Sequence, residues 1–158
     1  RAKCYDGALF AATALRRIGL PPLLIDLKAE RDSDHVIALF MRNGCYGAIS
    51  KSSFVSLRFR EPVYRSLREL AMSYFDSYFN FARQRTLRSY SLPFDLRALD
   101  HLSWMVDPDA LEEVAQRLDS SRHFALMSPR MIKQLNPIAR RTFRAACYGV
   151  RRNRADVL

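Results

Sequence analysis

Apolar positions recur at helical spacing over residues 4–18 and predict an opening helix. Gly19 and the proline pair at 21–22 predict its end, because glycine readily adopts left-handed backbone angles and proline blocks continuation. Segment 23–27 then predicts a strand. Segment 35–42 is apolar on both faces, which is typical of a central strand.

A tight hairpin turn is predicted at Asn43-Gly44, with 45–50 as the returning strand. Counting outward from this turn places Ser52 opposite His35. Side chains alternate along a strand, so Ser50 and Ser52 should share the sheet face of His35, unless a bulge moves the pairing by one residue.

The longest amphipathic pattern is REPVYRSLRELAMSYFDSYFNFA at 60–82, and it predicts a long helix. Apolar and aromatic residues repeat along one face of this helix, and Pro62 suits its first turn. We interpret the aromatic stripe as core packing rather than as a cofactor site.

The remaining segments predict one more strand and several shorter helices. The strand with its adjoining loop is expected within 86–96, and the helices are expected at about 108–118, 129–135 and 137–148. Ser128 and Asn136 each precede a proline and are the expected N-caps of the last two helices. The order of elements predicts an α+β fold, with a helix packed on a small antiparallel sheet and a helical C-terminal half.

The composition suits one compact domain spanning residues 1–158. The chain is 49% hydrophobic and 27% charged, and no apolar stretch approaches the roughly 20 residues of a transmembrane helix. The three cysteines, Cys4, Cys45 and Cys147, match neither a disulfide framework nor a metal-binding knuckle. A reducing compartment, and therefore the cytoplasm, is expected.

Basic residues dominate the charge and gather toward the C-terminal end. The formal net charge is +10, and residues 120–158 hold nine arginines and lysines against one acid. Such a segment attracts phosphates or an acidic partner, or is simply solvated. Charge alone supports a nucleic-acid-binding domain, since Phe143 and Tyr148 supply little of the aromatic stacking that such a domain needs.

Cys4 and His35 carry the candidate chemistry. Cys4 heads a predicted helix, where the helix dipole and free N–H groups favour a thiolate, and His35 opens a predicted strand. A thiol nucleophile needs a base within hydrogen-bond reach and a third group that orients the base. The structural alternative is that Cys4 packs as a small apolar side chain and His35 is a satisfied core or surface residue.

The stretches AKCYDGALFAATALRRIGLPP and SDHVIALFMRNGCYGAIS resemble the transglutaminase-like branch of the papain-fold superfamily. Members of that branch are cysteine peptidases, amidases, transglutaminases and acyltransferases that work through a thioester. The resemblance implies that Cys4 is the nucleophile and His35 the general base and acid, with Tyr46 where the family often has tryptophan. It covers about residues 1–55, which implies a core there and a family-specific helical extension over about 60–158.

Ser50 falls at the third catalytic position, where the family has aspartate. A hydroxyl can orient an imidazole, but it stabilises the imidazolium less than a carboxylate does. Asp32 or Asp34 could substitute, although Asp34 adjoins His35 and should point to the opposite face of the strand.

The expected activity is thiol-dependent hydrolysis or acyl transfer on a peptide or an amide-bearing small molecule. No cofactor or metal is expected, because the sequence has no glycine-rich phosphate loop and its histidines lack metal-ligand spacing. Cys45 and Cys147 are interpreted as packing residues, and His101 and His123 as structural or surface residues. The alternatives are a catalytically inactive papain-like binding domain and a basic nucleic-acid-binding domain. An acidic partner for the arginine-rich end is also expected, and association with a membrane is not.

Overall fold

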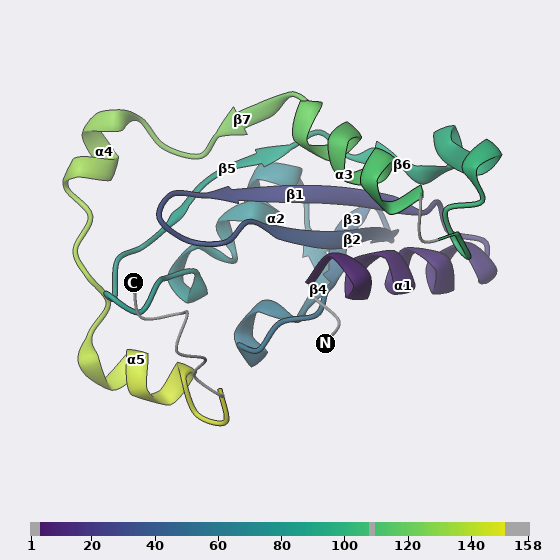
Figure 1. The fold of residues 1–158 in the computed structure, drawn as a ribbon. Coiled ribbons are helices and arrows are strands. Elements are labelled where there is room, and N and C mark those ends of the chain that lie inside the picture. Colours follow the sequence, from purple (N-terminus) through teal and green to yellow (C-terminus); the bar gives the residue numbers. More distant parts are fainter. Residues whose placement is uncertain (1–3, 108–109, 151–158) are drawn as a thin grey trace.

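Helices pack on both faces of one antiparallel sheet in a mixed α+β fold (Figure 1). The structure is a computed structural model that describes residues 4–107 and 110–150. The α-helices are α1 (Cys4–Arg17), α2 (Leu67–Met72), α3 (Ala110–Ser120), α4 (Pro129–Lys133) and α5 (Arg140–Ala146). The 3-10 helices are η1 (Val55–Leu57), η2 (Phe75–Ser77) and η3 (Leu96–Leu102). Every helix in the described ranges is too short or too polar to span a lipid bilayer.

The sheet has the strand order β4-β3-β2-β1-β5-β7, and β6 pairs with β1 as well. The strands are β1 (Leu23–Ala29), β2 (His35–Arg42), β3 (Cys45–Ile49), β4 (Phe59–Tyr64), β5 (Leu87–Ser91), β6 (Phe94–Asp95) and β7 (His123–Ala125). Their pairings are antiparallel. The predicted central strand is confirmed, because β2 lies between β1 and β3.

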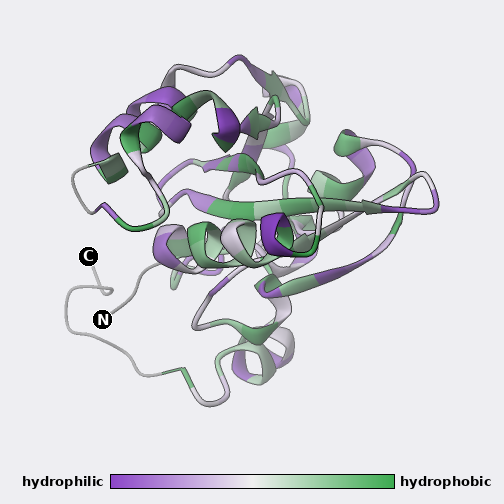
Figure 2. Ribbon diagram, turned by 90° about the vertical axis from the view of Figure 1, so that its right-hand side faces the viewer, coloured by the Kyte–Doolittle hydropathy of each residue, from purple (hydrophilic) through white to green (hydrophobic). Residues whose placement is uncertain are grey.

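Both faces of β1 and β2 are buried, because successive side chains enter opposite layers of the core. Leu24 and Ala38 pack with α1, α3 and η3, whereas Ile25 and Ile37 pack with α2 and the segment after it. Small side chains such as Ala8, which is fully buried, let α1 lie close to β2. Figure 2 shows the apolar colouring concentrated along the strands at the centre of the fold. Alternate residues of β1 and β2 therefore belong to different core layers, one on each face of the sheet.

The hairpin between β2 and β3 forms as predicted. Asn43-Gly44 has φ angles of 52° and 75°, the left-handed pair that a two-residue turn of this kind requires. Residues 38–42 pair with 45–49 in the expected register. The pairing ends there, so the predicted facing pair of His35 and Ser52 does not form.

The long helix predicted over 60–82 is wrong. Phe59–Tyr64 forms β4, which pairs with β3 at the edge of the sheet, and only Leu67–Met72 is α-helical. Ser66 starts α2 by accepting a hydrogen bond from a backbone N–H of the first turn. Pro62 has no backbone N–H, and it is tolerated because an edge strand does not need every N–H for pairing. Pairing with β3 therefore overrides the helical spacing of the apolar residues.

The aromatic residues of this segment pack in the core, as predicted. Tyr74, Tyr78 and Phe79 are each at most 5% exposed. Tyr74 and Tyr78 lie in the core layer that covers Ile37 and the same face of β2. Their backbone follows α2 through the short helix η2 rather than a continuous helix, so burial and helical periodicity are separate properties here.

The region expected as a helical extension is mixed instead. Helices α3, α4 and α5 form near their predicted positions, and segment 86–96 forms β5 and β6. Strands β4 and β7 were not predicted. All four strands after residue 58 join the sheet that β1, β2 and β3 begin. The described part of this region therefore completes the sheet rather than adding only helices to it.

One of the two predicted proline-linked caps is present. Ser128 caps α4 by accepting a hydrogen bond from a first-turn N–H at 3.3 Å. Asn136 does not cap α5, which begins four residues later with no side-chain cap. The physical reason is Ile138, which is buried and whose backbone N–H donates to the carbonyl of Arg83 at 3.0 Å. This tertiary contact holds the segment extended where a helix was expected.

Candidate active site

The thiol of Cys4 lies against the backbone just before His35. Cys4 opens α1 and is half-buried. Because α1 packs mainly on β2, the start of the helix comes near the start of that strand (Figure 1). Sγ donates a weak hydrogen bond to the backbone carbonyl of Asp34 at 3.8 Å. The fold therefore brings the cysteine to the residue that precedes the histidine.

His35 and Ser50 meet on the one sheet face that the strand register predicted for them, although the register placed Ser52 rather than Ser50 directly opposite His35. Nε2 of His35 lies 3.1 Å from Oγ of Ser50 and 3.2 Å from the carbonyl oxygen of Leu57. Ser50 follows the last residue of β3, and Leu57 belongs to the turn η1. The contact with Leu57 was not predicted, since the position of η1 against β2 depends on packing and has no local sequence signal.

These contacts define the tautomer of neutral His35. The Ser50 hydroxyl donates its proton to the carbonyl of Leu57 at 2.5 Å, so toward the imidazole this oxygen can only accept. The Leu57 carbonyl can also only accept. Nε2 must therefore carry the proton, which leaves the lone pair on Nδ1. Within the residues that the structure describes, Nδ1 makes no hydrogen bond.

Burial favours the neutral form of His35. The residue is 5% exposed, and the rings of Tyr74 and Tyr78 lie edge-on to it at centroid distances of 6.4 and 6.3 Å. Loss of hydration lowers the pKa of His35, the carbonyl of Leu57 opposes this, and the positive charge of Arg60 adds to it. His35 is therefore held in its neutral form, which can accept a proton. The imidazolium that results is destabilised by the same burial.

Other residues near His35 are bonded elsewhere. Ser52 accepts a hydrogen bond from the backbone two residues later. Asp34 points away as predicted, to the backbone and a side-chain amine of β1, and Asp32 accepts from the hydroxyl of a threonine just before β5. Among residues 4–107 and 110–150, His35 bonds to no carboxylate and shares no direct hydrogen bond with Cys4.

A cluster of charged residues lies beside the site and was not predicted. We call it the Lys28 cluster, and it consists of Asp26, Lys28, Asp34, Asp119 and His123. Nζ of Lys28 lies 2.6–3.1 Å from a carboxylate oxygen of each aspartate. These three carboxylates could hold a cation, and the ammonium of Lys28 occupies that position. The available signal was the two-residue spacing of Asp26 and Lys28, which puts both on one face of β1.

Asp26 gives the Lys28 cluster a dependence on pH. It is 2% exposed, and its Oδ1 has no hydrogen-bond partner within the described ranges. Burial raises the pKa of Asp26, while hydrogen bonds from Lys28 and His123 oppose that rise. The Asp26 carboxyl therefore holds its proton more tightly in the folded chain than in the unfolded chain. In consequence, the Asp26 contribution to the free energy of unfolding falls as the pH rises past about 4.

We expect Asp26→Asn to remove this part of the pH dependence. The free energy of unfolding of the variant minus that of the parent should increase as the pH rises from about 4 to about 7. Both free energies are measured by urea denaturation at each pH. Asp119→Asn is the control, because it alters a carboxylate that is 70% exposed and bonded to the same Lys28. Parallel stability curves for the parent and Asp26→Asn would contradict the prediction.

The chemistry of the site depends on three groups. They are a thiol at the start of a helix, an imidazole with its lone pair on Nδ1, and a hydroxyl that holds Nε2. Comparison of the chain with models of known protein families and with curated protein sequences gives no match.

Proposed function

We propose that the chain is a thiol-dependent hydrolase or acyltransferase with a papain-like, transglutaminase-like core. The observation that carries this proposal is the state of His35, whose Nε2–H is bound by Ser50 and Leu57 while Nδ1 keeps the lone pair. A thiol nucleophile needs a base prepared in this way. A helix that starts at Cys4 and a strand that starts at His35 are also the two elements that the family resemblance requires.

Cys4 supplies the nucleophile of the proposed reaction. Its thiol proton passes to Nδ1 of His35, and the thiolate attacks the carbonyl carbon of an amide or ester. Backbone N–H groups in the first turn of α1 stabilise the oxyanion. The imidazolium returns the proton to the departing amine or alcohol, which leaves a thioester on Cys4. Water or an amine then attacks the thioester and regenerates the thiol.

The proposed reaction requires the thiol to turn away from Asp34. At 3.8 Å, the hydrogen bond from Sγ to the Asp34 carbonyl is long and easily exchanged. Rotation about χ1 of Cys4 releases it between staggered positions. We expect a peptide or an amide-bearing small molecule as the substrate, because both present the carbonyl that the thiolate attacks.

The second candidate is a papain-like domain that binds a partner without catalysis. Ser50 favours it, because within residues 4–107 and 110–150 no carboxylate bonds to His35 and stabilises its imidazolium form. The hydrogen bond that engages the Cys4 thiol with Asp34 favours it as well. For this candidate the thiol is unreactive, and the basic C-terminal region binds an acidic partner.

Alkylation of the cysteines with iodoacetamide separates the two candidates. All three are half-buried thiols, so Cys45 and Cys147 serve as internal references for Cys4. The hydrolase predicts that Cys4 reacts at least about tenfold faster than either reference at pH 7. The rate is measured for each cysteine-containing peptide by mass spectrometry.

His35→Gln is the decisive variant for this experiment. Glutamine keeps a polar group near Ser50 but cannot accept the thiol proton at neutral pH. The faster reaction of Cys4 should disappear in this variant, while the rates of Cys45 and Cys147 stay unchanged. Circular dichroism shows whether the variant is folded. If Cys4 reacts no faster than the reference cysteines in the parent protein, the proposed hydrolase function is wrong and the binding domain is favoured.

A further inference from the structure

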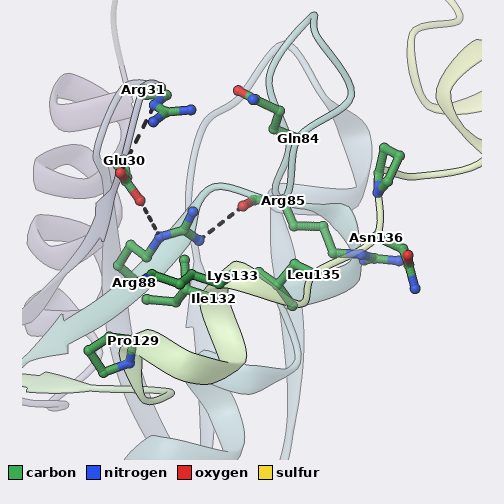
Figure 3. Close-up of a pocket in the computed structure, with 11 residues that line it drawn as sticks. Glu30, Arg31, Gln84, Arg85, Arg88, Pro129, Ile132, Lys133, Leu135 and Asn136 are labelled. Carbon is green, nitrogen blue, oxygen red and sulfur yellow. Dashed lines mark hydrogen bonds and ion pairs between the residues drawn. The ribbon is translucent and has the colours of Figure 1, made fainter.

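A pocket of about 690 Å³ opens between the loop after β1, the start of β5 and α4 (Figure 3). We call it the basic pocket and define it by six of its lining residues: Glu30, Arg31, Arg85, Arg88, Ile132 and Lys133. Its volume lies within the roughly 300–1,000 Å³ that small-molecule sites occupy. Cys4 and His35 do not line it, so it is a separate candidate site.

The lining of this pocket carries an excess of positive charge. Arg31, Arg85, Arg88 and Lys133 contribute four cationic side chains, and Glu30 contributes one carboxylate. Cations that converge on one recess repel each other and raise the local concentration of anions. This arrangement therefore favours a negatively charged ligand.

Two of the arginines are already held in place. Nε of Arg88 donates to Glu30 at 2.8 Å, and its Nη1 donates to the backbone carbonyl of Arg85 at 2.9 Å (Figure 3). The same Nη1 also donates to the backbone carbonyl of Leu87 at 3.0 Å. Arg85 pairs with Asp76 at 2.6 Å. The two arginine side chains are 20% and 22% exposed. Because they are ordered before a ligand arrives, binding costs little of their conformational entropy.

The other two cations are less engaged. In the described part of the chain Lys133 forms no ion pair, and Arg31 approaches only Glu30, at 4.0 Å. Arg31 has φ of 61°, a left-handed angle that is uncommon outside glycine, and Asn80 donates to its carbonyl at 3.2 Å. Both side chains can therefore reorient toward a ligand without breaking a strong ion pair.

We propose that the basic pocket binds a small ligand that carries a phosphate or carboxylate group beside an apolar part. Arg31 and Lys133 bind the anionic group through charge-assisted hydrogen bonds, and Arg85 and Arg88 add to the positive field. Ile132 supplies apolar contact on the α4 side of the pocket. This binding function is independent of the proposed thiol chemistry.

Phenyl phosphate, benzoate and benzyl alcohol test the proposal, because they share an aromatic ring and differ in charge. Binding is followed by the amide shifts of the protein in nuclear magnetic resonance spectra. We expect saturable shifts around the basic pocket with at least one of the two anions and none with benzyl alcohol. Tighter binding of phenyl phosphate identifies the group as a phosphate, and tighter binding of benzoate identifies it as a carboxylate.

A matched pair of variants on α4 places the ligand. Lys133→Gln should weaken binding of the preferred anion about tenfold, the contribution of one charge-assisted hydrogen bond. Arg130→Gln removes an exposed charge that does not line the pocket. The affinity of this variant for the preferred anion should stay within about twofold of the parent value. Equal weakening in both variants, or shifts that do not saturate, would overturn the proposal. Tighter binding of single-stranded DNA, weakened equally by both substitutions, would overturn it in favour of nucleic acid.

Discussion

Replacing Ser50 with aspartate should raise the proton affinity of His35 and make Cys4 alkylate about tenfold faster near neutral pH. The Ser50 hydroxyl lies 3.1 Å from Nε2, so a carboxylate there faces the N–H of the imidazole. It stabilises the imidazolium that burial now disfavours, and a charge-assisted hydrogen bond of this kind contributes about 1.5–3 kcal/mol. The pKa of His35, lowered in the parent protein, should therefore rise in Ser50→Asp.

Ser50→Asn is the matched control for this prediction. Asparagine has the size of aspartate without its charge, and it can still accept from Nε2 and donate to the carbonyl of Leu57. Histidine proton resonances, followed against pH, report the pKa of His35 in both variants. If Ser50→Asp and Ser50→Asn titrate alike, the carboxylate does not interact with the imidazole and the proposed role of position 50 is wrong.

Gly7→Ala should destabilise the fold by about 2 kcal/mol, within the usual range for overpacking. Alanine in a helix interior ordinarily adds up to about 1 kcal/mol of stability over glycine, so the expected sign is reversed. The reason is Lys51, because a Cβ on Gly7 would lie 2.2 Å from its Cβ and 3.2 Å from its Cδ. Such close contacts force Lys51 and the first turn of α1 apart.

The same substitution tests how the candidate site is held together. Lys51 follows Ser50, and the first turn of α1 carries Cys4, so separating the two should also remove any enhanced alkylation of Cys4. Lys51→Gly removes the atoms that clash, and the double variant should recover the lost stability in urea denaturation. A stable Gly7→Ala protein, improved by about 1 kcal/mol as helix propensity predicts, would contradict this prediction.

Local signals predicted the N-terminal third of the fold and the sheet face that His35 and Ser50 share. The backbone angles at Asn43-Gly44 depend only on residues beside the turn, and they determine the strand register. The register in turn predicts that Ser50 shares the face of His35. It places Ser52 opposite the histidine, however, and the hydrogen bond between His35 and Ser50 forms beyond the last pair of the ladder, Ala38 with Ile49. The opening helix likewise ends where Gly19, with φ of 85°, permits a left-handed angle.

Features that depend on distant partners were not predicted. The apolar spacing around Val63 satisfies a helix, but β4 forms because β3 offers an edge with which to pair. Leu57 in η1 and Arg60 in β4 reach the surroundings of His35 because tertiary packing positions both elements. Asp119 meets Lys28 only when α3 lies beside β1. None of these partners has a signal within a short window of the sequence.

The position of β1 has a consequence for synthesis on the ribosome. One edge of β1 pairs with β2 soon after it is made, but the other edge pairs with β5 and β6. About 60 residues separate β1 from β5, and at about 5–20 residues per second this interval lasts roughly 3–12 s. During that time a nascent strand with apolar residues on both faces presents unpaired backbone groups. Until β5 and β6 are made, this edge of β1 is therefore open to pairing with strands of other chains.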